Sequence, residues 1–345
     1  MFAGVINTNG DIILGGLFPI HKKSDKTENE CGTFSEVPGY QYMEAMLFAI
    51  DQINADTNLL PNITIGAKIY DTCTSTTIAA DRAKEFIKMT LVKDTKVQLA
   101  GVVGALSSGV SATVANFLRV FEIPQISYSS TSTILSNKDI YSYFLRTVAP
   151  DSFQARAMMD IIRHFRWKYV AAVNSAGAYG TKGMEIFLRN AREGGVCIDL
   201  KEELSLFPST AEYRKVMERL VRRSMQSNVS VVVLFCTQAD ARNLLEAAKF
   251  TQSARHFTFI GSDGWSNRFD VTETSHDVAQ GALTIMMRRG GELKKFEDYF
   301  VGLKRENYPR ENKRFVCLFV CLQFVQLSKQ RFALFVSTFG LCEIT

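Results

Sequence analysis

Short apolar segments alternate with helix-length segments along most of the chain. The clearest apolar segment, residues 229–235, reads VSVVVLF and ends in five apolar residues in a row. A strand that is apolar on both faces is typical of a parallel sheet covered by helices on both sides. Alternation of such strands with helices of about 10 to 15 residues indicates βαβ units. The sequence therefore predicts an α/β protein.

The alternation falls into two series, one before and one after Pro150. The first has predicted strands at 12–14, 63–70, 97–103 and 123–128, and helices at 40–54, 79–91 and 110–121. The second has predicted strands at 168–173, 196–200, 229–235, 257–260 and 281–287, and helices at 152–165, 182–193, 211–225 and 239–251. Two series predict two lobes, each a mostly parallel sheet flanked by helices.

Helical spacing also predicts which side chains face the two cores. Those of the helix at 110–121 are Val110, Val114, Phe117, Leu118 and Phe121, and those of the helix at 152–165 are Phe153, Ala157, Ile161 and Phe165.

Length and charge narrow the possible functions. The 345 residues are enough for about two domains. The net charge of +5 is spread over short clusters, and no basic stripe is interleaved with aromatic residues, so we expect no nucleic-acid partner. We expect neither a secretory signal nor a membrane span in this fragment, because residues 1–10 lack a signal pattern and no apolar run approaches roughly 18 residues.

The sequence lacks the usual motifs of catalysis and metal binding. None of the four histidines lies in a ligand spacing, the seven cysteines form no CxxC pair, and no GxSxG elbow occurs. We therefore expect no metal, no cofactor and no enzymatic activity. Asn62 and Asn228 each begin an Asn-x-Ser/Thr tripeptide, which makes them candidate glycosylation sites.

Polar loops follow the predicted strands, at the sheet edge where open parallel sheets bind their ligands. These loops are residues 104–109, 129–133, 174–180, 236–238 and 261–265. The loop at 129–133 reads SSTST, five hydroxyl residues in succession. From the residues alone, it is either a solvated turn or part of a pocket for a small polar ligand.

Two neighbouring loops have groups that suit a carboxylate. Ser108 and Gly109 lie just before the helix predicted at 110–121, where free backbone N–H groups and the helix dipole favour an anion. A serine in this place also simply caps the helix. Ser129 and Thr131 would lie on the next loop along the same sheet edge, and a carboxylate between the two loops would have several donors.

An α-amino acid also needs a partner for its ammonium group. Carboxylates provide charge-assisted hydrogen bonds, and aromatic rings provide cation–π attraction. Asp151, Tyr179 and Asp263 each lie near a predicted strand end or a crossing between lobes. Aspartate is also a common turn former in such places, so both roles stay open at this point.

Several long stretches resemble the ligand-binding domain of metabotropic glutamate receptors, in class C of the G-protein-coupled receptors. They are GDIILGGLFPIH, AIDQINADTNLLPNITIGAKIYDTC, FEIPQISYSSTSTILSNKDIYSYFLRTVAPDSFQARAM and FIGSDGWSNRFDVT. The resemblance covers about residues 9–313 and implies a two-lobed, periplasmic-binding-protein-like (type I) fold, called a Venus flytrap, that closes on an amino acid.

The resemblance also implies how the chain divides. Lobe 1 would contain residues 9–146 and 289–313 and be incomplete, and lobe 2 would contain residues 147–288. Residues 314–345, rich in phenylalanine, would be an atypical tail of the kind produced by mistranslation or alternative splicing.

Roles for single residues follow from the resemblance. On lobe 1, Ser108 and Thr131 match the positions for the carboxylate and amine, with Ser129 beside them. On lobe 2, Asp151, Tyr179 and Asp263 match the positions for the ammonium, and Arg268 matches one near the ligand side chain. Cys31 and Cys73 match a disulfide pair. Ser130, Ser132 and Thr133 are then expected to be turn and surface residues.

The sequence departs from the family at the ligand side chain. Tyr42 stands where glutamate receptors carry an arginine, and Pro38 stands where they have a tyrosine. The ligand is therefore expected to be glutamate or another α-amino acid, with a neutral or aromatic one able to stack on Tyr42.

The expected function is that of an extracellular amino-acid-sensing domain, glycosylated and disulfide-bonded, at the outer face of the plasma membrane in the full-length protein. A homodimer through lobe 1 and a G protein, reached through a membrane domain that this fragment lacks, are the expected partners. The alternatives are a soluble solute-binding or decoy protein and an α/β enzyme.

Overall fold

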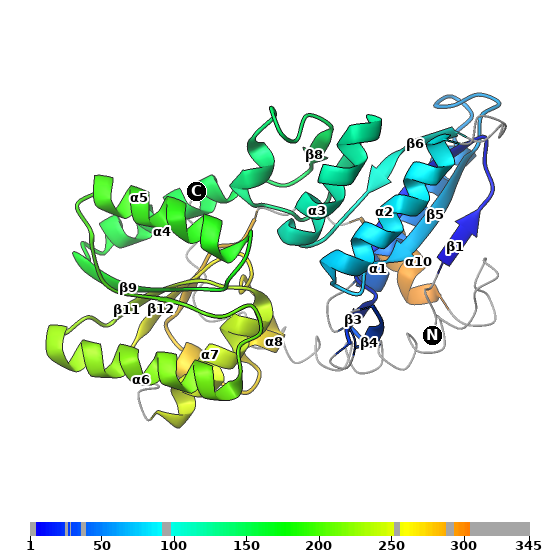
Figure 1. Ribbon diagram of the computed structural model, residues 1–345. Coiled ribbons are helices and arrows are strands. Elements are labelled where there is room, and N and C mark those ends of the chain that lie inside the picture. The colour runs from blue at the N-terminus through cyan, green and yellow to red at the C-terminus, as the bar shows by residue number, and fades with distance from the viewer. Residues whose placement is uncertain are drawn as a thin grey trace.

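The computed structural model describes residues 5–24, 27, 29–35, 39–91, 98–251, 256–287 and 293–303. Within these ranges the chain forms two mainly parallel sheets, each flanked by helices (Figure 1). This confirms the predicted α/β class and agrees with a periplasmic-binding-protein type I fold. We call the part built on the first sheet lobe 1 and the part built on the second sheet lobe 2.

The first sheet is built from strands that all lie within residues 5–146. Its order is β1 (Val5–Thr8), β5 (Ile65–Asp71), β2 (Ile12–Phe18), β6 (Gln98–Val103), β7 (Gln125–Ser127) and β8 (Phe144–Arg146). Only the pairing of β1 with β5 is antiparallel in this sheet as described. Because β6 and β7 are parallel neighbours, the loops that follow them leave the same edge of the sheet.

Helices cover both faces of the first sheet. The apolar side chains of α1 (Gly39–Ala55) pack on one face, and those of α2 (Thr76–Leu91) and α3 (Ser108–Leu118) pack on the other. Late in the chain, α10 (Lys294–Gly302) returns to α1, where Phe296 lies 5.6 Å from Phe48 between ring centroids. Tyr299 also donates its hydroxyl to Glu44 at 3.0 Å, so α10 contributes to lobe 1.

The second sheet is parallel throughout its described strands, in the order β10 (Cys197–Glu203), β9 (Tyr169–Asn174), β11 (Val231–Phe235), β12 (Thr258–Gly261) and β13 (Leu283–Thr284). One face is covered by α4 (Asp151–His164) and α5 (Gly180–Glu193) (Figure 1). The other is covered by α6 (Thr210–Ser227) and α7 (Gln238–Phe250), with the short helices α8 (Phe269–Thr272) and α9 (His276–Ala279).

The central strand β11 shows why its sequence is apolar throughout. Val231, Val233 and Phe235 pack under α4 and α5, whereas Val232 and Leu234 pack under α6 and α7. All five are buried. The two-sided burial that the sequence predicted is therefore confirmed for this strand.

Two predicted helix faces are partly wrong. On α4, Phe153 is 61% exposed and Phe165 is 50% exposed, and the buried stripe instead runs through Ala155, Met158 and Ile162. Two stripes fit the same helical period on this helix, so spacing alone could not choose between them. Phe165 stacks on Trp167 with 4.7 Å between ring centroids.

The predicted inner face of α3 is also wrong in part, because Phe117 and Phe121 are exposed. The helix ends at Leu118 and continues as a 3₁₀ turn over Arg119–Phe121. The tighter turn rotates later residues away from the α-helical face.

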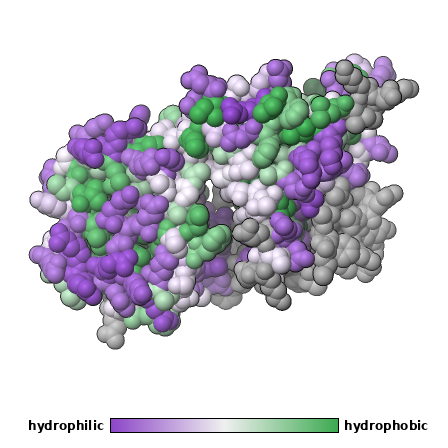
Figure 2. All heavy atoms as spheres, in the orientation of Figure 1, coloured by the Kyte–Doolittle hydropathy of each residue, from purple (hydrophilic) through white to green (hydrophobic). Residues whose placement is uncertain are grey.

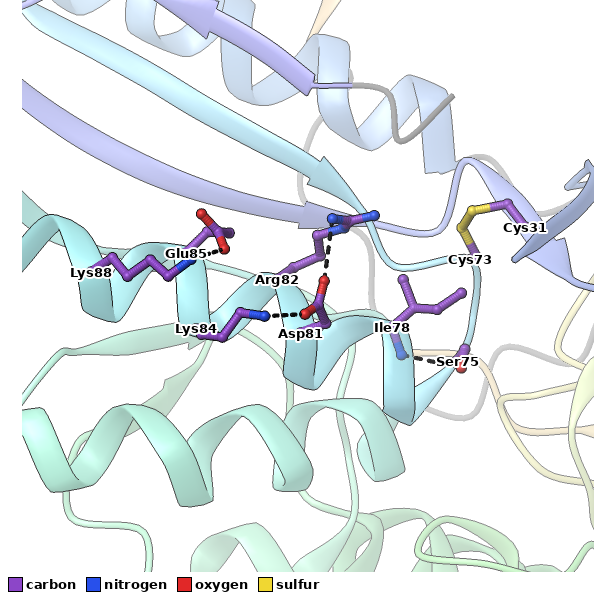
Figure 3. Close-up of polar contacts among 9 residues, drawn as sticks. All are labelled: Cys31, Cys73, Ser75, Ile78, Asp81, Arg82, Lys84, Glu85 and Lys88. Atoms are coloured by element: carbon purple, nitrogen blue, oxygen red, sulfur yellow. Dashed lines mark hydrogen bonds and ion pairs between the residues drawn. A yellow bond between two sulfur atoms is a disulfide. The ribbon is translucent and has the colours of Figure 1, made fainter. Parts of the chain in front are cut away.

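Cys31 and Cys73 form a disulfide, the pair that the resemblance implies. It ties β4 (Cys31–Phe34), which pairs with β3 (His21–Lys23), to the loop between β5 and α2 (Figure 3). In that loop Ser75 accepts a hydrogen bond from the backbone N–H of Ile78.

Figure 3 also shows the ion pairs of α2, which join Asp81 to Arg82 and Lys84, and Glu85 to Lys88. These pairs are mostly exposed and contribute little stability.

The predicted lobe boundaries, 9–146 with 289–313 and 147–288, stay predictions. Of the returning segment, residues 289–292 and 304–313 lie outside the described residues, as does the whole tail at 314–345. None of the helices in the described ranges is long and apolar enough to cross a lipid bilayer.

Candidate functional site

Polar groups from both lobes meet where the strands of the two sheets end. In the space-filling view the surface is hollowed between the lobes (Figure 2). On lobe 1, the loops after β6 and β7 lie together, because the backbone N–H of Ser132 donates to Ser108 Oγ at 3.1 Å. On lobe 2, β9, β11 and β12 are neighbours, so their loops share one edge.

The five-hydroxyl segment is more buried than the sequence suggested. Ser130 and Ser132, which were expected to be turn and surface residues, are fully buried, as is Thr131. Ser130 Oγ lies 2.7 Å from Ser111 Oγ, and Ser132 Oγ donates to the carbonyl oxygen of Ala178 in lobe 2 at 2.5 Å. The expectation for Ser130 and Ser132 is wrong because both hydroxyls find partners in other segments. Thr133 begins a 3₁₀ turn and is partly exposed, as is Ser129.

Arg146 fixes the backbone of the five-hydroxyl segment, and the sequence did not predict this role. Its guanidinium donates to the carbonyl oxygens of Ser130 at 3.3 Å and Ser132 at 2.8 Å, and to Ser136 Oγ. These bonds depend on the pairing of β8 with β7, which the sequence pattern missed.

Ser108 and Gly109 form the first turn of α3. Ser107 is the N-cap, and its Oγ accepts from the N–H of Val110 at 3.4 Å. Ser108 is therefore not the cap, and its buried hydroxyl faces the hydroxyl-rich loop. A side chain placed on Gly109 would meet no atom within 4 Å, so the helix start is open at this point. The first N–H groups of a helix have no partner within it and are available to an anion.

Asp151, Tyr179 and Asp263 come together on lobe 2, from three separate segments. Tyr179 Oη lies 2.5 Å from Asp263 Oδ1 and 2.8 Å from Ser262 Oγ. Gln154 links the two aspartates, because its Nε2 lies 2.6 Å from Asp151 Oδ1 and 2.8 Å from Asp263 Oδ1. The sequence reasoning missed Gln154, although it lies one helical turn after Asp151.

Thr131 lies next to this cluster and connects it to lobe 1. Its carbonyl oxygen accepts from the backbone N–H of Asp151 at 2.8 Å. Asp151 Oδ2 is buried and has no hydrogen-bond partner among the described residues. A buried carboxylate oxygen of this kind requires a cationic or hydrogen-bonding partner.

Burial changes the acid–base behaviour of the cluster. It raises the pKa of Asp151 to about 7, and the nearby charge of Asp263 adds to the rise, while hydrogen bonds from the side chains of Thr131 and Gln154 and the charge of Arg146 oppose it. Burial also raises the pKa of Tyr179 well above its usual value, so this phenol keeps its proton. The cluster can therefore accept a cation, while the phenolic hydrogen of Tyr179 is held inside it by Asp263.

Tyr42 and Arg268 contact other residues of their lobes. Tyr42 packs on Tyr128 with 5.1 Å between ring centroids, and Tyr128 stacks on Phe18 at 5.4 Å, which makes an aromatic wall on lobe 1. Arg268 is the N-cap residue of α8 and pairs with Asp270, with Nε 3.4 Å from Oδ1.

Both candidate glycosylation sites are exposed. Asn62 and Asn228 adopt left-handed backbone conformations, with φ of 62° and 56°, and Asn228 ends α6.

Comparison with known proteins agrees with this architecture. Residues 41–318 match the family model described as receptor family ligand binding region. The chain is 41% identical over 315 residues to metabotropic glutamate receptor 8 of Homo sapiens, covering 87% of this chain and 34% of that receptor. It is 40% identical over 321 residues to metabotropic glutamate receptor 4 of Mus musculus, covering 88% and 35%. The chain thus spans about a third of the length of these curated relatives.

Two mainly parallel sheets with polar strand-end loops are the architecture of a two-lobed binding protein. The chain belongs to the receptor family ligand-binding region and is related to metabotropic glutamate receptors 8 and 4. This family is one of receptor ligand-binding domains and not of enzymes, which confirms both the resemblance and the expectation that the chain is not an enzyme.

Proposed function

We propose that this chain is the extracellular amino-acid-binding domain of a metabotropic glutamate-like class C receptor, and that it senses its ligand by closure of the two lobes. One observation carries the proposal: two aspartates on lobe 2 share a hydrogen-bond network, and a buried oxygen of one of them has no partner among the described residues. An ammonium group supplies the missing charge and hydrogen bond.

The rest of an α-amino acid fits the groups on lobe 1. Its carboxylate would take the hydroxyl of Ser108 and the open helix start at Gly109, with Ser129 and Thr131 beside it. The aromatic side chain of Tyr179 would add cation–π attraction for the ammonium. A ligand that contacts both lobes binds the closed state more tightly than the open state. This difference in affinity shifts the equilibrium toward the closed state.

The ligand side chain would lie toward Tyr42 on lobe 1 and Arg268 on lobe 2. The relatives are named for glutamate, but Tyr42 offers a ring instead of a cation. We propose that the site takes an α-amino acid and that a neutral or aromatic side chain is accepted against the wall of Tyr42 and Tyr128.

Our proposals for partners other than the ligand are based on the family resemblance and not on the geometry of the site. We propose a homodimer through lobe 1, coupling to a G protein through a membrane domain, and glycosylation at Asn62 and Asn228, whose exposure suits an attached glycan.

Calorimetry of the chain against the twenty amino acids tests the binding function. The proposal expects at least one to bind at millimolar concentration or below. It also expects Asp263→Ala to weaken the best ligand at least about tenfold, because it removes a charged partner of the ammonium. No binding by any amino acid, or an unchanged affinity in Asp263→Ala, would contradict it.

A further inference from the structure

Gln154 connects two carboxylates that are far apart in the sequence. It is 8% exposed and lies on α4, one turn after Asp151. Its Nε2 donates to Asp151 Oδ1 at 2.6 Å and to Asp263 Oδ1 at 2.8 Å, and Asp263 is 109 residues away on the loop after β12. Its Oε1 accepts the backbone N–H of Asp263 at 3.0 Å.

This set of bonds fixes the orientation of the amide. Both Nε2 hydrogens are used, one on each carboxylate, and Oε1 has a donor of its own. Rotating the amide by half a turn would set Oε1 against two carboxylate oxygens and Nε2 against an N–H group. The side chain of Gln154 therefore has one arrangement that satisfies all its partners.

The side chain of Gln154 is uncharged, and this affects how the two carboxylates can interact with a ligand. Two ionised carboxylates that approach one site repel each other. A lysine in this place would neutralise them and occupy the position of a ligand cation. A glutamate would add to the repulsion. The neutral amide of Gln154 donates a hydrogen bond to each aspartate and leaves their negative charge available to a ligand cation.

The remaining bonds leave one open position. Tyr179 donates to Asp263 Oδ1, so that atom already receives two donors. Asp151 Oδ1 receives the amide, and Asp151 Oδ2 stays buried without a partner among the described residues. Gln154 thus sets which carboxylate oxygen of Asp151 is left for a ligand.

We infer that Gln154 is a positioning residue that holds Asp151 and Asp263 as a pair for the ammonium group of the ligand. The inference rests on the proposed amino-acid-binding function. It explains how the site would prefer an amino acid to its des-amino analogue, which lacks the ammonium group. Gln154 itself would not touch the ligand.

The test compares two ligand pairs on the full chain by calorimetry: L-glutamate with glutarate, and L-phenylalanine with 3-phenylpropanoate. The variant Gln154→Met keeps the length of the side chain and removes its hydrogen bonds. We expect it to weaken the better amino acid about tenfold or more, and the matching des-amino acid less than about threefold. The control is Gln226→Met, the same change at an exposed position on α6, which should leave the affinities for both the amino acid and the des-amino acid unchanged.

A second variant keeps the inference testable if Gln154→Met does not fold. In Gln154→Lys the new ammonium lies between the two carboxylates and acts as a built-in cation. We expect a higher Tm than wild type and loss of amino-acid binding by more than about tenfold. A Gln154→Lys protein that binds the amino acid as tightly as wild type would overturn the inference.

The outcomes separate the two proposals. If wild type binds no amino acid, the proposed function fails and the inference fails with it. If wild type binds one and Gln154→Met binds it equally well, only the inference fails. Equal weakening of the amino acid and its des-amino analogue would also overturn it, because that result shows a general structural role.

Discussion

Ser132 Oγ in lobe 1 donates a hydrogen bond to the carbonyl oxygen of Ala178 in lobe 2, at 2.5 Å. Ser132 lies directly after Thr131, and Ala178 lies directly before Tyr179, so the bond joins the two sides of the candidate site. It exists only while these two loops are together. The contact therefore favours the arrangement in which both lobes can hold one ligand.

Ser132→Ala should weaken ligand binding through this contact. A buried hydrogen bond contributes about 1 kcal/mol, which corresponds to roughly fivefold in affinity. The backbone of Ser132 keeps its bond to Arg146, so the fold should persist. Calorimetry with the best amino acid measures the effect, with the exposed Ser142→Ala as control. An unchanged affinity would show that the contact does not bias lobe closure.

Ligand binding should depend on pH near neutrality because burial raises the pKa of Asp151 to about 7. The ammonium needs the ionised carboxylate. Below pH 7 binding must first release the proton, so affinity should fall roughly tenfold for each pH unit. Calorimetry between pH 5.5 and 8.5, in buffers of different ionisation enthalpy, measures both affinity and proton release. The exposed His164→Gln should show the same profile as wild type, and a flat profile in wild type would refute this role for Asp151.

Asp151→Asn should abolish binding and stabilise the unliganded chain at pH 8. The pKa of Asp151 is raised on folding, so its contribution to stability is present below its ordinary pKa and is lost as the pH rises through about 7. At 1.36 kcal/mol per pKa unit, the gain from removing the charge is at most about 4 kcal/mol at pH 8. Thermal melts should show this gain shrink as the pH falls toward 4. A lower Tm than wild type at pH 8 would contradict the assignment.

Cys31→Ser should lower stability through loss of the disulfide to Cys73, across a sequence separation of 42 residues. Loss of such a bond costs about 2–4 kcal/mol. The matched control is Cys197→Ser, because Cys197 is an exposed free cysteine. Thermal melts under oxidising conditions should show a lower Tm for Cys31→Ser alone, and equal Tm values for the two variants would argue against a stabilising disulfide.

The strength of the local pattern decided which parts of the fold could be predicted. The strand β11 was predictable because its side chains are apolar on both faces. The strands β3 and β8 were missed because they are three residues long and owe their conformation to pairing with β4 and β7.

The residues of the candidate site also fall into those that the sequence predicted and those that it did not. The rule that ligands bind at strand ends pointed to Asp151, Tyr179 and Asp263, which the fold brings together. The roles of Gln154 and Arg146 could not be read from the sequence. Each depends on contacts that only the folded arrangement creates, such as the bond from Gln154 to Asp263.

Tyr42→Arg should shift the ligand preference toward acidic amino acids. The family resemblance leads us to expect an arginine of glutamate receptors at the position of Tyr42, and an arginine that pairs with a carboxylate contributes about 1.5–3 kcal/mol, or roughly 10- to 100-fold in affinity. Glutamate should therefore gain affinity and an aromatic ligand should lose it, because the ring beside Tyr128 is removed. Tyr42→Phe keeps the ring and should leave the aromatic ligand unchanged. Calorimetry with L-glutamate and L-phenylalanine measures both changes. If glutamate gains nothing in Tyr42→Arg, then Tyr42 does not face the ligand side chain, and selectivity must arise elsewhere in the site.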